Sequence, residues 1–166
     1  MRIVIQESGL SFGEYDKTDC FNIEKSTVYK SLGSNVRVIE FILRHKNDEI
    51  LMIEAKSSSP KPGNNNNFDK FIEEIGDKFA HSIDLFFSLI IGRLGDQETD
   101  MPEYFRTADY SVAKITMLLV INWHEISRLS PISEALRRKL KRQMKTWRLN
   151  LSVMNHELAG KYGLLK

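Results

Sequence analysis

Two β-rich segments, Val36-Arg-Val-Ile-Glu-Phe-Ile-Leu-Arg44 and Ile50-Leu-Met-Ile-Glu-Ala-Lys56, lie five residues apart in the first third of this 166-residue chain. The polar link His45-Lys-Asn-Asp-Glu49 between them predicts a β-hairpin. Both segments carry apolar side chains at odd and at even positions, which indicates strands that are buried on both faces. Three ionisable residues interrupt these otherwise core-like strands: Glu40, Glu54 and Lys56.

The hairpin brings these three charged residues together. Centred on residue 47, it sets Glu40 opposite about residue 54, with Cβ atoms roughly 4.5–5.5 Å apart. Two carboxylates this close repel each other unless a proton or a cation lies between them. Mg²⁺ or Mn²⁺ prefers oxygen ligands and resolves that conflict, and Lys56 reaches the same place. The alternative is a buried salt-bridge triad that holds the hairpin together without an ion.

The remaining elements follow from hydrophobic periodicity and turn-forming residues. We expect strands over 1–6, 114–121 and 149–154, helices over 23–32, 68–91 and 131–147, loops over 57–67 and 92–108, and a helical turn over 157–162. Strands that alternate with helices pair in parallel, and their carboxyl ends share the sheet edge where such proteins bind ligands. The sequence therefore predicts one domain over 1–166 with an α/β fold, a mixed β-sheet flanked by helices.

The charged residues of the hairpin resemble the motif of a known family. Glu40, a gap of thirteen residues, and Glu54-Ala55-Lys56 near the end of the next strand are similar to the PD-(D/E)xK nuclease superfamily, whose core is restriction-endonuclease-like. The resemblance covers about residues 24–121. It implies that Glu40 and Glu54 are metal ligands, that the Ala55 carbonyl is a further ligand, and that Lys56 helps to activate water.

The sequence differs from the family pattern at the first acid, and the position of one further acid is open. The first acid of the family is normally an aspartate, and Glu40 is one methylene longer, which alters the expected metal geometry. The family often adds an upstream helical glutamate, for which Glu24 is the best match and Glu7 the second candidate.

The net charge of +2 conceals a polarised chain. Residues 135–166 hold nine Lys or Arg residues and one acid, a formal charge of +8, whereas residues 1–134 carry −6. A basic segment of this kind predicts an anionic partner. A solvent-facing amphipathic helix explains the same pattern equally well. The candidates for phosphate contacts are Arg137, Arg138, Lys141, Arg142 and Lys145.

Two polar segments follow strands at the expected ligand edge, Asn122-Trp-His-Glu125 and Asn155-His-Glu157. A histidine there would bind phosphate or transfer a proton. The alternative, which the pattern favours, is that these residues cap the strand ends and begin the next helix.

Several classes of protein are excluded by composition. One cysteine, Cys20, makes no internal disulfide, and no Cys/His cluster has the spacing of a zinc site. The first residues lack the apolar region of a signal peptide, and the longest apolar stretch, over 85–91, is too short to cross a bilayer. We therefore expect a cytoplasmic protein without a membrane partner.

The resulting hypothesis is an endonuclease or exonuclease that depends on Mg²⁺ or Mn²⁺, with DNA favoured over RNA as its nucleic-acid substrate. A catalytic domain this small has little surface for sequence recognition, which suggests a homodimer or a separate specificity partner. The alternative is a catalytically inactive member of the same fold that binds nucleic acid or a protein.

Overall fold

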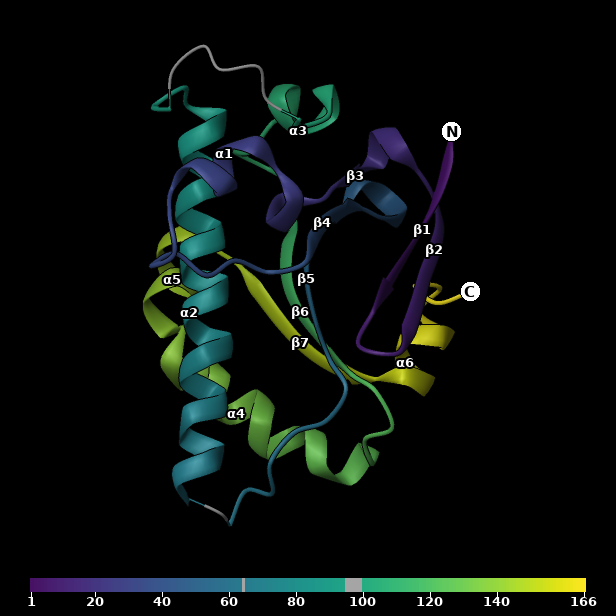
Figure 1. The fold of residues 1–166 in the computed structure, drawn as a ribbon, viewed down its shortest axis with the longest axis vertical. Helices are drawn as coiled ribbons and strands as arrows, with labels where there is room; N and C mark the ends of the chain where they lie inside the picture. Colours follow the sequence, from purple (N-terminus) through teal and green to yellow (C-terminus); the bar gives the residue numbers. More distant parts are fainter. Residues whose placement is uncertain (64, 95–99) are drawn as a thin grey trace.

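The computed structural model describes residues 1–63, 65–94 and 100–166, which fold around a five-stranded sheet (Figure 1). The strands, in spatial order, are β3 (Cys20–Phe21), β4 (Phe41–Arg44), β5 (Ile50–Lys56), β6 (Ile115–Ile121) and β7 (Asn150–Asn155). Strands β3 to β5 pair antiparallel, and β5 to β7 pair parallel. The predicted α/β class, a mixed sheet flanked by helices, is confirmed.

The two faces of the sheet have different covers. Helices α2 (Asn65–Ile90), α4 (Leu129–Lys139) and α5 (Lys141–Trp147) cover one face, and α2 runs along most of the molecule (Figure 1). A separate hairpin and a C-terminal helix cover the other face. They are β1 (Arg2–Glu7), β2 (Leu10–Asp16) and α6 (His156–Lys161). Because both faces are covered, β5 is buried along its length up to Lys56.

Alternation along β5 distributes its side chains between these two cores. Ile50 and Met52 pack on the α2 side, together with Phe79 of that helix. Leu51 and Ile53 pack on the side of the β1–β2 hairpin. Since successive side chains of a strand point to opposite faces, Glu54 and Lys56 face α2.

The strand predicted over 36–44 is shorter than expected. Among these residues only Phe41–Arg44 forms a strand. The backbone N–H of Arg37 donates to His81 Nδ1 (3.1 Å), and that of Ile39 donates to Ser82 Oγ (2.9 Å). Both partners belong to α2, so the helix satisfies backbone groups that would otherwise need a neighbouring strand.

The basic helix predicted over 131–147 is also different, because it is two helices. Leu140 separates α4 from α5, with φ −98° and ψ 12°. Its side chain is buried in the core of the α2 side, and its N–H still donates to the Leu136 carbonyl (2.8 Å). The bend keeps Leu140 in the core while the chain changes direction.

Smaller differences concern segments rich in turn formers. The helix predicted over 23–32 is a 3₁₀ turn, η2 (Ile23–Lys25), followed by α1 (Thr27–Ser31), and Ser26 caps α1 through its hydroxyl. The loop predicted over 92–108 contains α3 (Glu103–Thr107), and its residues 95–99 lie outside the described residues. The start of α2 overlaps the loop predicted over 57–67, and β2 and β3 were not predicted from the sequence. Further 3₁₀ turns are Lys17–Asp19, Lys46–Asp48 and Ile126–Arg128.

Candidate active site

Glu40, the residue before β4, and Glu54 of β5 approach the same lysine, Lys78. The register pairs Phe41 with Ile53, and the Glu40 N–H donates to the Ile53 carbonyl (3.1 Å). Glu40 directly precedes β4, and continuing the register by one position sets it opposite Glu54, as the sequence predicts. The Glu54 side chain is fully buried, and that of Glu40 is 12% exposed.

A lysine that the sequence did not single out lies between these acids. Lys78 of α2 places Nζ 2.8 Å from Glu54 Oε1 and 3.8 Å from Glu40 Oε1. Lys56 Nζ lies 3.5 Å from the same Glu54 oxygen and 2.8 Å from Glu74 Oε1. The other oxygen of Glu54, Oε2, is buried without a hydrogen-bond partner among the residues that the structure describes. Leaving such an acceptor unpaired costs about 1–3 kcal/mol or more.

Glu40 also belongs to a second group of carboxylates, with Glu7 and Glu24. Glu7 is the last residue of β1, and Glu24 belongs to η2. One carboxylate oxygen from each of Glu7, Glu24 and Glu40 lies within 4.8 Å of the other two. Both candidates for the upstream acid therefore reach the predicted site. Lys25, which is exposed, forms an ion pair with Glu7 at 3.7 Å.

The crowding of acids raises the proton affinity of the central pair. Burial, together with the charges of Glu54 and Glu24, raises the pKa of Glu40 to about 8. Burial also raises the pKa of Glu54, although Lys78 and Lys56 oppose the shift. Burial disfavours the charged form of Lys78, but Glu54 and Glu40 outweigh it and raise the pKa of this lysine. The site thus holds more negative charge than its lysines neutralise.

These groups fit a divalent cation with oxygen ligands. Glu54 Oε2 and the carboxylates of Glu7, Glu24 and Glu40 are the donor type that Mg²⁺ and Mn²⁺ bind. A cation would relieve the same repulsion that a proton on Glu40 relieves. Two observations therefore support a divalent cation here: the carboxylate oxygens are suitable ligands, and the buried Glu54 Oε2 has no hydrogen-bond partner among the described residues.

The Ala55 carbonyl, expected as a further ligand, faces the turn between β1 and β2. It accepts a hydrogen bond from Ser8 Oγ at 3.0 Å, and Ser8 directly follows Glu7. A carbonyl oxygen has two lone pairs, so this bond leaves one for another partner.

The polar segments after β6 and β7 do lie at the carboxyl edge. The Asn122 N–H donates to the Lys56 carbonyl (2.8 Å), and Asn122 Nδ2 donates to the Ser8 carbonyl (3.2 Å). Asn155 Nδ2 donates to the His124 carbonyl (2.9 Å). The two asparagines thus tie the edge loops together, which agrees with the capping alternative for these residues.

The basic helices α4 and α5 contact a different side of α2 from the one that faces Glu40 and Glu54. Lys139 of α4 forms ion pairs with Glu73 and Asp77, whereas the adjacent positions Glu74 and Lys78 contact the candidate site. The predicted phosphate-contacting residues are therefore not beside the strand ends.

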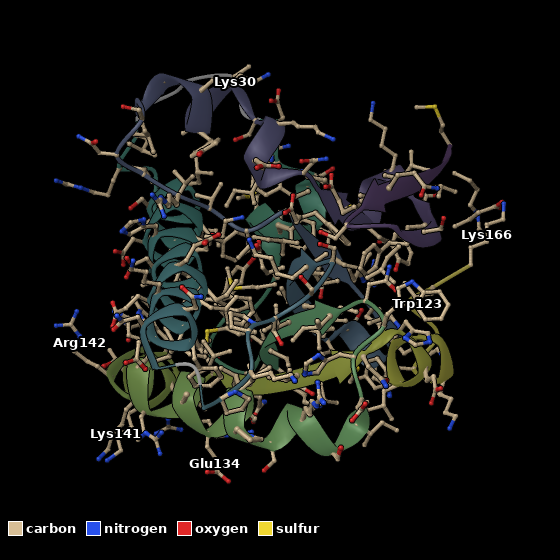
Figure 2. The ribbon with its side chains drawn as sticks, turned by 60° about the horizontal axis from the view of Figure 1, so that its bottom comes forward. Lys30, Trp123, Glu134, Lys141, Arg142 and Lys166 are labelled. Atoms are coloured by element: carbon tan, nitrogen blue, oxygen red, sulfur yellow. The ribbon has the colours of Figure 1, made fainter. Side chains whose placement is uncertain are left out.

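Their individual environments differ. Arg137 Nη2 donates to the Leu151 carbonyl of β7 (2.7 Å), which gives this residue a structural contact. The other four predicted residues, Arg138, Lys141, Arg142 and Lys145, are exposed. Figure 2 shows Lys141 and Arg142 projecting from the molecule on the side away from Trp123.

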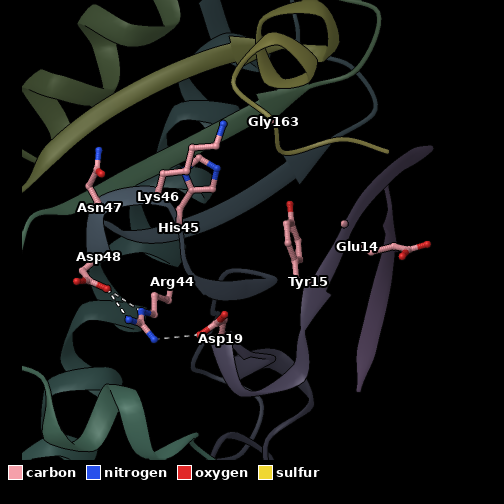
Figure 3. A pocket seen from close by; sticks show the side chains of 10 residues that line it. Glu14, Tyr15, Asp19, Arg44, His45, Lys46, Asn47, Asp48 and Gly163 are labelled. Carbon is pink, nitrogen blue, oxygen red and sulfur yellow. Dashed lines mark hydrogen bonds and ion pairs between the residues drawn. The ribbon is translucent and has the colours of Figure 1, made fainter.

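A polar cavity of about 570 Å³ lies at the other end of β4 and β5 (Figure 3). Arg44 on its wall is paired with Asp48 (2.6 Å) and Asp19 (3.4 Å), and its guanidinium lies over the Tyr104 ring at 4.1 Å. Because these groups already satisfy one another, the cavity offers weaker ligand chemistry than the acids at Glu40 and Glu54.

Lys78 and Glu74 were missed because α2 carries polar residues all along its exposed side. The signal that could have identified them is their position next to Ile75 and Phe79, two core residues of the apolar stripe. Polar residues at the border of an apolar stripe lie close enough to the sheet for a long side chain to reach its edge.

Comparisons with protein-family models, with curated proteins and with solved structures found no match for this chain. Within the described part of the chain, no helix combines the length and hydrophobicity needed to cross a membrane. Any assignment of function must therefore be argued from the chemistry of the site.

Proposed function

We propose that this protein is a nuclease dependent on Mg²⁺ or Mn²⁺, with Glu40, Glu54 and Lys56 at its active site. The observation that carries the proposal is a pair of carboxylates, Glu40 directly before β4 and the fully buried Glu54 of β5, with Glu54 Oε2 unpartnered in the described ranges. Membership of the PD-(D/E)xK superfamily, DNA as the substrate and the cytoplasm as the compartment belong to the same proposal. The motif Glu40…Glu54-Ala-Lys56 supports the first of these.

The acidic residues and one carbonyl of the site would serve as metal ligands. Glu40 and Glu54 would hold the ion, with Glu24 or Glu7 and the Ala55 carbonyl completing the ligands. When bound, the ion supplies charge that polarises a phosphodiester oxygen and acidifies a water molecule.

Lys56 would act beside these ligands, on water or on phosphate. Its side chain is 25% exposed, so its ammonium reaches solvent from the buried site. From there it would orient the attacking water or stabilise charge that develops on the phosphate. The hydrogen bond to Glu74 (2.8 Å) fixes the position of its ammonium.

A second candidate function is a non-catalytic module of the same fold. Lys78 favours it, because Lys78 and Lys56 together satisfy one oxygen of Glu54, as a structural ion-pair network would. Such a module would bind nucleic acid through the exposed cations of α4 and α5, or bind a protein.

Metal binding tests the proposal directly. We expect Mn²⁺ to bind the purified protein in isothermal titration calorimetry, and Glu54→Gln to weaken binding at least about tenfold because it removes a charged ligand. Glu134→Gln, at an exposed acid of α4, is the matched control and should bind like the parent. Absence of binding by the parent at millimolar Mn²⁺ would contradict the nuclease.

Cleavage tests the role of Lys56. With Mn²⁺, we expect cleavage of plasmid DNA, and Lys56→Met should slow it by about 10² or more if its ammonium stabilises charge in the transition state. Lys30→Met, at an exposed lysine of α1, should leave the rate unchanged. Cleavage that Lys56→Met does not slow would point to another site or to a contaminating nuclease, and an RNA substrate tested in parallel decides between the nucleic acids.

A further inference from the structure

Trp123 is an exposed aromatic residue just beyond the end of β6. Its exposed fraction is 80%, and Figure 2 shows its ring at the edge of the molecule. Its backbone is left-handed, with φ 53°, a conformation that bulky residues rarely adopt and that costs about 1–3 kcal/mol. The fold thus holds a large apolar side chain in solvent at a conformational cost, and core packing does not account for it.

The loop that carries Trp123 is fixed on both sides. Before it, Asn122 is hydrogen-bonded to Lys56 and Ser8. After it, the His124 carbonyl accepts a hydrogen bond from Asn155. The ring centroid of Trp123 lies 4.7 Å from that of His156, the first residue of α6, with 43° between the ring planes. The two rings therefore form a defined aromatic surface.

This surface adjoins the candidate active site along the sheet edge. Asn122, which precedes Trp123, is bonded to the carbonyl of Lys56, and Ile121 pairs with Lys56 in the sheet. His156 follows Asn155, which pairs with Ile121 on the far side. The segments that carry the two rings therefore follow strands β6 and β7, one and two places along the sheet from β5, where neighbouring strands lie about 4.8 Å apart. Because Lys56 faces α2 and α6 covers the opposite face, a nucleic-acid strand that contacts Lys56 and both rings would cross the sheet edge.

We propose that Trp123 and His156 form a stacking surface for an unpaired nucleobase of a single-stranded nucleic acid. The proposal rests on the proposed nuclease function, because it assumes that the same strand reaches Lys56 and Glu54. An exposed ring accepts the face of any base, whereas the bases of a duplex are covered by their neighbours. The surface would therefore select single-stranded over double-stranded substrate.

The second tryptophan provides a matched control. The ring of Trp147 lies 4.3 Å from that of Phe87 with 5° between the planes, so one of its faces is already occupied within the fold. The chain has two tryptophans, and Trp147→Phe therefore leaves Trp123 as the single source of tryptophan fluorescence.

The test is a fluorescence titration of the Trp147→Phe protein in the presence of a metal chelator, so that no cleavage occurs. We expect a single-stranded oligothymidylate to quench Trp123 emission more strongly than a duplex of the same length. In a separate anisotropy measurement with a labelled oligonucleotide, Trp123→Ala should weaken single-strand binding by about 5- to 150-fold, the range for one stacked base. Trp123→Phe should retain most of the affinity, and Trp147→Phe all of it.

The outcomes separate this inference from the proposed function. Equal or stronger quenching by the duplex, or single-strand affinity unchanged in Trp123→Ala, would overturn the stacking surface even if Mn²⁺-dependent cleavage is observed. Quenching by the single strand without any metal-dependent cleavage would support the surface and contradict the nuclease. No quenching by either form would leave a protein partner as the occupant of Trp123 and overturn the inference.

Discussion

The ammonium group of Lys78 supplies the positive charge nearest to the buried carboxylate of Glu54. An ion that binds Glu54 must compete with it, since both need the same carboxylate. Lys78 therefore has opposite effects on the two states of the site. It stabilises the acids when no ion is bound, and it opposes the binding of an ion.

We predict that Lys78→Met lowers the stability of the metal-free protein by about 3–5 kcal/mol, because a buried charge loses its partner. The same substitution should strengthen Mn²⁺ binding, because methionine does not compete for the carboxylate. Urea unfolding in chelator and calorimetric titration measure the two effects. Lys70→Met, at an exposed position of α2, should change neither. Weaker Mn²⁺ binding in Lys78→Met would contradict this competition.

The raised pKa of Glu40 predicts how stability depends on pH. In the folded protein its pKa is about 8, against an ordinary value of 4.5, so between these values the folded state binds the extra proton. Stability must then fall as pH rises from about 5 to 8, with a slope approaching about 1.4 kcal/mol per pH unit for one proton. Urea unfolding of the metal-free protein across this range measures the slope.

Glu40→Gln is the control for this pH dependence. Glutamine resembles the protonated carboxyl group, so the variant should lose most of the slope and be more stable than the parent at pH 8. A parent whose stability rises between pH 5 and 8 would show that Glu40 is ionised in the folded protein.

At the scale of elements, the β1–β2 hairpin is positioned by a close approach at Gly9. Its φ is +77°, and a Cβ at this position would lie 2.9 Å from Asn122 Nδ2. We predict that Gly9→Ala destabilises the protein by about 1–3 kcal/mol through backbone strain and displacement of this amide. Gly63→Ala, where nothing lies within 4 Å, should be near neutral. Thermal unfolding compares the two, and equal effects would contradict the close approach.

The elements that sequence predicted well are those whose signal is local. The segment 50–56 is a strand over its whole predicted length, because its apolar run and the polar turn before it are both local features. The prediction of a strand was wrong for residues 36–40, because His81 and Ser82, distant in sequence, accept the hydrogen bonds of the Arg37 and Ile39 backbone N–H groups. The break at Leu140 likewise follows from core packing rather than from a breaker residue.

The same distinction applies to the candidate site. Glu40 and Glu54 could be brought together from sequence because hairpin register links their positions. Lys78 could not, because its approach depends on the angle at which α2 crosses the sheet. The exposure of Trp123 could not be predicted from the sequence either. It depends on a left-handed backbone whose neighbours, Asn122 and His124, are held by Lys56 and Asn155.

At the scale of the whole molecule, the exposed cations of α4 and α5 form a basic surface separate from the acidic site. We predict that the combined variant Arg138→Gln, Lys141→Gln and Arg142→Gln weakens DNA binding and reduces the slope of log affinity against log salt by about 2 to 3. Fluorescence anisotropy across a salt series measures both. Lys30→Gln, at a distance from this surface in Figure 2, is the control. An unchanged slope would show that phosphates do not contact these helices.

The acids that would hold a metal ion come from β1, η2, the residue before β4, and β5, so they come together only in the folded chain. A cation that binds there must stabilise the fold as a whole, by about 2.7 kcal/mol at a concentration of 100 times its dissociation constant. We predict that the midpoint of thermal unfolding rises with Mn²⁺ by about 2–4 °C per kcal/mol. Glu40→Gln should abolish most of the rise, whereas Glu134→Gln should preserve it. A midpoint that Mn²⁺ does not change would contradict the metal site, and the ion pairs of Lys78 and Lys56 would then suffice to explain why these acids are buried.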